Sequence, residues 1–403
     1  MQDDINTPKT LPAAQQGSIS WPGDCYWGEG AVVRAAQAAR PRMQRSLLVT
    51  DAVVWQALEP VVRPALGDLP LALYSGVLPN PTLGQIREAL QVGQQNGCDS
   101  VIAVGGGSVI DVAKVVLACL GSGMSVDDIQ SPAGQAWLDT AASANDPVFV
   151  AVPTTSGTGS ESSSAALIQA DDGRKRVFRS LRTRPSLVAL QPDLTLSLPK
   201  RPTAQGGFDA ILHALGAWIN TDPSPIGKAA ALQSLSLSLQ ALPAVLEQPA
   251  SLQARADMQM GSYLAGIAIG MCKVDAVHGM CTPLEARVHM THAEVLAPIF
   301  SLVARYTAQT QPERYAQAAV ALGVSNTGEP GRDALALIER IEALARQGGI
   351  ATSFSDLTLT RADAALLAQQ ALQSASTPLN PRPLSTQEIE ALYLQMATPG
   401  DKA

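Results

Sequence analysis

The chain has 403 residues, of which 46% are hydrophobic and 16% charged, a composition typical of a soluble globular protein. At about 150 residues per domain, this length predicts two or three domains, each large enough to bury a core. The 28 Lys and Arg against 35 Asp and Glu give a formal net charge of -7, which argues against a nucleic-acid partner. With only 4% aromatic residues, base-stacking surfaces are not expected either.

Targeting and membrane signals are weak in this sequence. Residues 1–17 are polar and include acids, without the basic and then apolar pattern of a signal peptide. The most apolar window, residues 101–124, is interrupted by three glycines, Asp111 and Lys114, which argues against a membrane span. Five scattered cysteines in a chain of this length predict no disulfide framework. We therefore expect a cytoplasmic protein with no membrane partner.

The first half of the chain alternates short β-rich runs with helical patterns. Continuous apolar runs separated by helices predict a parallel sheet covered on both faces. The expected strands are 46–50, 71–74, 100–104, 148–152 and 186–190, with helices at 84–95 and 109–120.

After about residue 195 the pattern becomes helical throughout. We therefore predict an α/β dinucleotide-binding domain over residues 1–198 and an all-helical domain over residues 199–403. The expected helices of the second domain are 225–246, 251–271, 293–307, 332–347, 361–374 and 386–396.

A glycine-rich turn follows the strand at 100–104. Gly105, Gly106, Gly107 and Ser108 precede a helix that starts near Val109. Glycines allow close backbone approach and a helix N-terminus offers free N–H donors, which together favour phosphate binding. The alternative is an ordinary glycine turn, with Asp111 and Lys114 as an i,i+3 ion pair on the helix surface.

Two further segments suit a polar ligand. Residues 152–161, which include Thr154, Thr155 and Thr158, are mostly hydroxyl-bearing or glycine; the alternative is a solvated turn. Asp51 follows the first expected strand, where dinucleotide-binding folds place an acid for ribose hydroxyls; the alternative is a helix N-cap.

Only four histidines occur in the chain, so metal or acid–base chemistry has few locations. Asp209 and His213 are four residues apart, which places both on one face of a helix. His278 and His292 would lie about 21 Å apart on one helix, but Pro283 between them predicts a break. Three imidazoles and a carboxylate would form a site for Fe²⁺ or Zn²⁺; the alternative is four ordinary histidines.

These segments together resemble the iron-containing alcohol dehydrogenase family. The resemblance covers residues 46 to about 300, in family order, and the separate motifs are individually weak. They are GGGSVIDVAK (105–114), PTTSGTGSE (153–161), GFDAILHA (207–214), VHGM (277–280) and the segment around His292.

The resemblance implies a dehydroquinate synthase-like fold with a divalent metal between an α/β nucleotide-binding domain and an all-α domain. It also implies hydride transfer between NAD(H) and a small alcohol or aldehyde, and a homodimer. Asp51 matches an acid associated with preference for NAD over NADP. Asp209, His213, His278 and His292 match the metal ligands, with Fe²⁺ expected and Zn²⁺ or another divalent ion as alternatives. The cofactor positions are Asp51, Gly105, Gly106, Gly107, Ser108, Asp111, Thr154, Thr155, Thr158 and Lys175.

The chain also departs from the family pattern. Thr282 stands where many members have a histidine for proton transfer, with His289 as a conceivable substitute. Gly216 replaces the glutamate of the family's HAxE pattern. Lys273 and Asp275 replace small residues in a glycine-rich segment, and the Glu285-Ala-Arg287 segment is unusual. We hypothesise that Lys273 or Arg287 binds an anionic aldehyde or keto acid; the alternative is that both charges are solvated.

Two other functions remain open at this point. The same fold supports hydroxyacid–oxoacid transhydrogenases, maleylacetate reductases and dehydroquinate-synthase-like lyases. A catalytically inactive nucleotide-binding protein is the non-enzymatic alternative, suggested by Thr282 and the altered segment 271–287.

Overall fold

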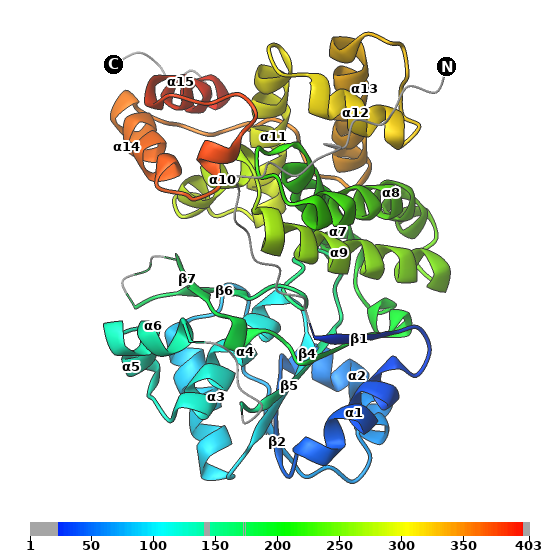
Figure 1. Ribbon diagram of the computed structural model, residues 1–403, viewed down its shortest axis with the longest axis vertical. Helices are drawn as coiled ribbons and strands as arrows, with labels where there is room; N and C mark the ends of the chain where they lie inside the picture. The colour runs from blue at the N-terminus through cyan, green and yellow to red at the C-terminus, as the bar shows by residue number, and fades with distance from the viewer. Residues whose placement is uncertain (1–22, 141–145, 172, 174, 398–403) are drawn as a thin grey trace.

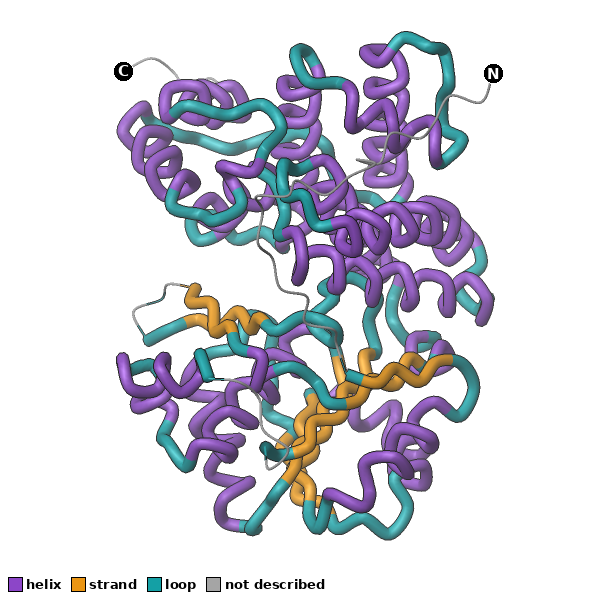
Figure 2. The backbone as a smooth tube through the Cα atoms, viewed as in Figure 1, coloured by secondary structure: helices purple, strands orange, loops and turns teal. Residues whose placement is uncertain are grey.

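The computed structural model describes residues 23–397 except 141–145, 172 and 174, so the polar segment 1–17 lies outside the described residues. Two halves are stacked along the long axis of the molecule (Figure 1). All described strands belong to the first half, while the second contains helices and loops (Figure 2). The predicted fold class, a parallel-sheet domain followed by helices, is confirmed. The division at residues 198 and 199 stays a prediction; the structure ends its last described strand at Leu190 and starts the next long helix at Lys200.

A six-stranded sheet with order β1-β8-β5-β4-β2-β3 forms the centre of the first half, and all its pairs are parallel. The five predicted strands lie within one residue of their expected bounds. The structure adds β1, a short edge strand that the sequence analysis missed. The strands are β1 (Asp24–Trp27), β2 (Ser46–Thr50), β3 (Leu71–Tyr74), β4 (Ser100–Gly105), β5 (Val148–Pro153) and β8 (Leu187–Leu190).

Alternate residues of each central strand pack against opposite helical layers, because successive strand side chains point to opposite faces. On β2, Leu47 and Val49 join the core beneath α3 (Leu83–Gln95) and α4 (Gly107–Ser122). Leu48 joins the core on the other face, beneath α1 (Ala31–Ala39) and α2 (Ala52–Ala65). The double cover explains why these strands are apolar along their whole length.

A second, antiparallel hairpin was not predicted. It consists of β6 (Ala165–Gln169) and β7 (Lys175–Arg179). Figure 1 shows it at the top of the α/β half, facing the helical half. Only Phe178 of β7 is buried, so this strand lacks the apolar pattern that identifies a strand in sequence. The short helices α5 (Val126–Ile129) and α6 (Pro132–Leu138) lie between β4 and β5 in sequence.

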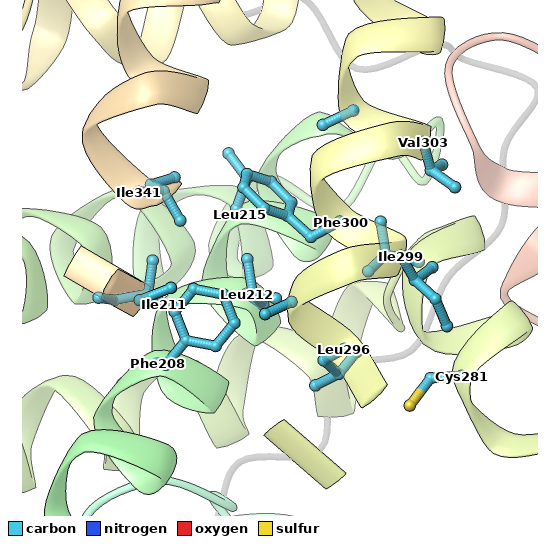
Figure 3. Close-up of a cluster of buried hydrophobic side chains, with 14 of the residues drawn as sticks. Phe208, Ile211, Leu212, Leu215, Cys281, Leu296, Ile299, Phe300, Val303 and Ile341 are labelled. Atoms are coloured by element: carbon cyan, nitrogen blue, oxygen red, sulfur yellow. The ribbon is translucent and has the colours of Figure 1, made fainter. Parts of the chain in front are cut away.

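The second half is built around a core between α7 (Lys200–Ile219) and α11 (His292–Ala308). Figure 3 shows Phe208, Ile211, Leu212 and Leu215 of α7 facing side chains of α11, and Phe208 contacts Phe300 edge-on. The remaining helices of this half are α8 (Pro225–Glu247), α9 (Leu252–Cys272), α10 (Ala276–Glu285), α12 (Glu313–Ala321), α13 (Pro330–Gln347), α14 (Arg361–Leu372) and α15 (Thr386–Met396).

Helix α8 is long and apolar enough to cross a bilayer by length and composition, as are α9 and α10 if they are counted together. It packs between α7 and α9, as a core helix of a soluble protein does. All five cysteines are free thiols, which confirms that no disulfide framework exists.

Candidate active site between the two halves

Helix α7 presents two chemically different faces. Phe208, Leu212 and Leu215 face the helical core, whereas Asp209 and His213 belong to the wall of a cleft. Asp209 and His213 are four residues apart, so they share one face, as predicted from their spacing. The apolar face therefore fixes the orientation of the two polar side chains.

His278 and His292 come from two separate helices. His278 lies on α10, and His292 is the first residue of α11. The expected break between them exists, but it is not at Pro283. Helix α10 continues through this proline and ends at Glu285. Pro283 thus lies inside the last turn of α10, where it cannot donate the i→i−4 hydrogen bond, and the helix ends two residues later.

Three imidazole nitrogens surround one carboxylate oxygen. The Nε2 atoms of His213, His278 and His292 lie 3.6, 3.7 and 3.7 Å from Asp209 Oδ1. These distances exceed hydrogen-bonding range, and Asp209 Oδ1 and His278 Nε2 are buried with no hydrogen-bond partner among the described residues. Tetrahedral ligands about 2.1 Å from one metal ion lie about 3.4 Å apart. The ligand atoms of Asp209, His278 and His292 all lie within 4.8 Å of one another and could hold one metal ion, and His213 Nε2 lies 3.6 Å from the same Asp209 oxygen. Ordinary buried histidines would instead be hydrogen-bonded.

The protonation states of Asp209 and His213 suit a cation. Burial lowers the pKa of His213 to about 4, so its ring is neutral at pH 7. Burial opposes ionisation of Asp209, but the surrounding imidazoles outweigh it and lower its pKa to about 2. A neutral imidazole and an ionised carboxylate are the ligand forms that divalent metals require.

Burial also opposes protonation of His278 and His292, but their neighbours outweigh it. Asp209 and Asp275 raise the pKa of His278, and Cys281 and Glu285 raise the pKa of His292. A bound metal would therefore replace a proton on these two rings.

The cluster opens into a cleft of about 560 Å³ lined by both halves of the molecule. From the first half, Asp111 and Lys175 reach this cleft together with the glycine-rich turn. From the second half, Lys273 and the turn after α9 reach it. Of the predicted site residues, the cleft is lined by Gly107, Ser108, Asp111, Thr158, Lys175, Asp209, His213 and His292. Asp51, Gly105, Gly106, Thr154, Thr155 and His278 do not line it.

The two polar loops lie side by side at the carboxyl edge of the sheet. Gly105 ends β4 and is paired with Pro153 at the end of the adjacent β5. A Cβ atom at Gly107 would lie 2.7 Å from the side chain of Thr158, so the close contact of the loops requires glycine there. Ligands of open α/β sheets bind outside the carboxyl ends of the strands, which is where these loops meet.

The environment of Asp111 and Lys114 differs from the surface location that the sequence analysis gave this pair. Lys114 is fully buried, and its Nζ donates to Ser160 Oγ at 2.7 Å and to the carbonyl of Ala165 at 2.6 Å. Asp111 accepts hydrogen bonds from Ser160 Oγ and from the Leu167 N–H. The predicted i,i+3 ion pair exists, with Lys114 Nζ 3.7 Å from Asp111 Oδ1, but it is buried and not on the helix surface. Lys114 connects the helix to the second loop and to β6.

The solvated-turn alternative for residues 152–161 was wrong as well, since Thr154, Ser156, Ser160 and Glu161 are buried. Burial raises the pKa of Glu161 to about 7. The loop is therefore a packed element beneath the cleft.

Glu285 is the site residue whose role sequence reasoning missed. Its Oε1 accepts from Lys175 Nζ at 2.7 Å, and its Oε2 lies 3.0 Å from His292 Nδ1. Burial opposes ionisation of Glu285, but His292 and Lys175 lower its pKa to about 2. Glu285 was singled out only as part of an unusual segment, and no sequence spacing connects it to Lys175, 110 residues away.

The turn after α9 is conformationally unusual. Lys273 has φ 60° and ψ −162°, a combination that is essentially restricted to glycine. The Asn220 Nδ2 group donates to the Cys272 carbonyl at 2.8 Å, and buried Lys228 donates in turn to Asn220 Oδ1. These contacts hold the strained turn in place, with Lys273 lining the cleft.

The remaining sequence candidates lie elsewhere. Asp51 is the N-cap of α2 and accepts from the Val54 N–H at 2.8 Å, which is the alternative given for it. His289 is exposed, and Thr282 bonds to the His278 carbonyl; neither lines the cleft. Arg287 pairs with Asp363 outside the cleft.

Comparison with known proteins decides the family. The sequence profile described as "Iron-containing alcohol dehydrogenase" matches residues 22–192, and the profile of the C-terminal part of the Fe-containing alcohol dehydrogenase family matches residues 203–397. The chain belongs to the iron-containing alcohol dehydrogenase family. It is similar to 1,3-propanediol dehydrogenase of Klebsiella pneumoniae, with 33% identity over 87% of this chain and 91% of the relative.

Two other similarities agree with this assignment. Lactaldehyde reductase of Escherichia coli (strain K12) is 29% identical over 91% of this chain and 96% of the relative. A crystal structure of 1,3-propanediol oxidoreductase superposes with a TM-score of 0.85 and 29% identity, covering 95% of this chain and 100% of that one. The iron-containing alcohol dehydrogenase fold is thereby confirmed. The chain is an oxidoreductase of alcohols or aldehydes, in a family that uses NAD(H) and a divalent metal, usually iron.

Proposed function

We propose that this protein transfers hydride between NAD(H) and a small alcohol or aldehyde at a divalent metal, Fe²⁺ in preference to Zn²⁺ or another ion. The observation that supports this most strongly is the placement of three imidazole Nε2 atoms around Asp209 Oδ1, with Asp209, His213 and His292 lining the cleft. Asp209, His213, His278 and His292 would hold the metal. When bound, it supplies a Lewis acid that stabilises negative charge on the substrate oxygen, and the nicotinamide carries the hydride.

The other predicted residues position the cofactor in this proposal. The backbone N–H groups of Gly107 and Ser108, at the N-terminus of α4, would bind the pyrophosphate. Asp111 and Thr158 line the same cleft as that turn and as Asp209, His213 and His292. The first half would thus hold the nicotinamide against the substrate, and the fixed separation of the reacting atoms accelerates transfer.

The proposal is tested by NADH oxidation with a panel of small aldehydes, together with the reverse reaction on the alcohols. We expect metal-dependent turnover with NADH and its loss in His278→Ala. Turnover between two bound substrates without net NADH consumption would instead support the transhydrogenase alternative. The inactive-protein alternative predicts NADH binding with no turnover of any substrate. Homodimeric assembly and a cytoplasmic location stay predictions.

A second candidate function is the reduction of an anionic aldehyde or keto acid. Lys273 favours it over Arg287, because only Lys273 lines the cleft. Its ammonium forms no ion pair or hydrogen bond with a described residue, and its backbone conformation costs about 1–3 kcal/mol. A strained cation beside the metal ligands is explained if it binds the acidic group of a substrate.

Lys273→Gly tests this candidate by removing the charge and relieving the strain. We expect a higher Tm and a loss of about tenfold or more in kcat/KM for a carboxylated aldehyde, because a hydrogen bond to a charged group contributes about 1.5–3 kcal/mol. The neutral aldehyde of similar size should be turned over unchanged, and Arg287→Ala should affect neither substrate. An unchanged ratio of the two kcat/KM values in Lys273→Gly would reject the candidate.

A further inference from the structure

The cleft contains one carboxylate that connects the metal ligands to the opposite half of the molecule. Glu285 is the last residue of α10 and its side chain is only 9% exposed. Each of its two oxygens has a different partner: Lys175 Nζ at 2.7 Å and His292 Nδ1 at 3.0 Å. Lys175 starts β7 in the α/β half, so the contact crosses the cleft between the two halves (Figure 1).

The Glu285 contact determines which nitrogen of His292 is available. A neutral imidazole has one N–H and one lone pair, and a carboxylate accepts only. In the neutral form that binds a metal, His292 would therefore carry its proton on Nδ1, 3.0 Å from Glu285 Oε2, and its lone pair on Nε2, which lies 3.7 Å from Asp209 Oδ1. Metal-binding histidines commonly donate their second N–H to a carboxylate in this manner, which orients the ring and makes it a better ligand.

The other oxygen of Glu285 restrains Lys175. This lysine lines the same cleft as the glycine-rich turn and occupies a predicted cofactor position. Cys281, Glu285 and His292 could by distance form a second metal group, but Lys175 Nζ already provides a cation 2.7 Å from that carboxylate. Glu285 is therefore better explained as a connector than as a ligand.

We propose that Glu285 is a positioning residue that couples metal binding to dinucleotide binding, by orienting His292 for the metal and holding Lys175 across the cleft. The inference rests on the proposed function only in taking His292 as a metal ligand and Lys175 as a cofactor contact. Its consequence is that one substitution on α10 alters the affinities of two sites in different halves of the protein.

The test measures binding without substrate. Metal-stripped protein is titrated with Co²⁺ against a chelator of known affinity, and NADH binding is followed separately by fluorescence. Glu285→Gln and Glu285→Ala should weaken Co²⁺ binding by about 10- to 100-fold and change the visible Co²⁺ spectrum. Arg287→Gln, two residues away and outside the cleft, is the matched control and should bind Co²⁺ like the wild type.

The coupling to the cofactor is tested with Lys175→Met in both backgrounds. If Glu285 holds Lys175, this change should weaken NADH binding clearly in the wild type and much less in Glu285→Ala. Thermal unfolding shows whether each variant is folded. If Glu285→Ala does not fold, the comparison is made with the isosteric variant Glu285→Gln.

The proposal would be overturned if a folded Glu285 variant bound Co²⁺ with an affinity within twofold of the wild type. It would also be overturned if Lys175→Met weakened NADH binding equally in the wild type and in Glu285→Ala. Because no turnover is measured, these outcomes do not depend on the identity of the substrate. A wild-type protein that binds neither Co²⁺ nor NADH would instead refute the proposed function itself.

Discussion

Buried ionisable groups lie in and beneath the loop at residues 153–161 as well as at the proposed metal ligands. Glu161 is 2% exposed, and its only side-chain hydrogen-bond partner among the described residues is Ser262, at 3.5 Å. Burial raises its pKa from 4.5 to about 7, while nearby Lys114, whose own pKa burial lowers to about 8, partly offsets the effect. A buried carboxyl of this kind favours its neutral form, so it should make stability depend on pH.

Glu161→Gln should remove that dependence. Below about pH 4.5 Glu161 is protonated in both the folded and the unfolded chain. As pH rises through about 7, the unfolded chain loses its proton first, so the free energy of unfolding falls by up to about 3 kcal/mol at about 1.4 kcal/mol per pKa unit. The variant should therefore have a higher Tm than the wild type at pH 8 and a similar Tm at pH 5. A wild-type advantage at pH 8 would contradict this assignment.

Asp51 tests the cofactor preference at the same scale. We predict that a carboxylate there repels the 2′-phosphate of NADP, so Asp51→Gly should raise kcat/KM with NADPH relative to NADH by about tenfold or more. Glycine replaces an N-cap at a cost of only about a few tenths of a kcal/mol, so the fold should persist. Asp51→Asn keeps the cap without the charge and should shift the preference in the same direction. An unchanged preference in both variants would show that Asp51 serves α2 alone.

At the scale of elements, Gly216 of α7 lies against Asp275, in the segment after α9. A Cβ atom at Gly216 would lie 3.1 Å from Asp275 Oδ1, and Asp275 Oδ1 lies 3.9 Å from His278 Nδ1. The family resemblance implies a glutamate at position 216 and a small residue at 275. In this chain the carboxylate of Asp275, just before α10, occupies the space that a side chain at 216 would need.

The reciprocal exchange tests this relation. Gly216→Glu alone should crowd Asp275 with a like charge, and Asp275→Gly alone should remove the carboxylate beside His278. The double variant should recover most of the lost Tm and Co²⁺ affinity, because contacting sites show coupling of about 0.5–3 kcal/mol. If the losses of Tm and Co²⁺ affinity in the two single variants simply add in the double variant, carboxylates at positions 216 and 275 do not share one position.

Helices that are buried on one face and strands that are buried on both faces could be predicted from the sequence, because such burial leaves a clear apolar pattern. Strands such as β4 and β5 are mostly apolar, and the four-residue spacing of Asp209 and His213 placed them on one helical face. Helix α7 itself was not among the predicted helices, because it is buried on most sides and lacks a clear polar face. Hairpin β6–β7 escaped prediction because it lies over the cleft with little burial of β7. Pro283 was misread as the end of a helix because a proline close to a C-terminus is compatible with the last turn. Glu285 and Lys175 meet only through the tertiary fold, so no local pattern could pair them.

At the scale of the whole molecule, the two halves supply different parts of one site. The carboxyl edge of the sheet provides the glycine-rich turn, and α7, α10 and α11 provide the four metal-site side chains. Contacts from α9 hold the halves together: Ser162 Oγ donates to the Tyr263 carbonyl at 2.7 Å, and Gln259 Nε2 donates to the Pro153 carbonyl. The proposed chemistry therefore depends on both halves and on a metal between them.

The most direct test of that claim is NADH-dependent aldehyde reduction by one preparation before metal removal, after removal by a chelator, and after addition of Fe²⁺. We predict loss of activity on removal and recovery with Fe²⁺, while NADH binding persists in the metal-free protein and His278→Ala cannot be reactivated. Full activity in protein shown by elemental analysis to be free of divalent metal would contradict the account.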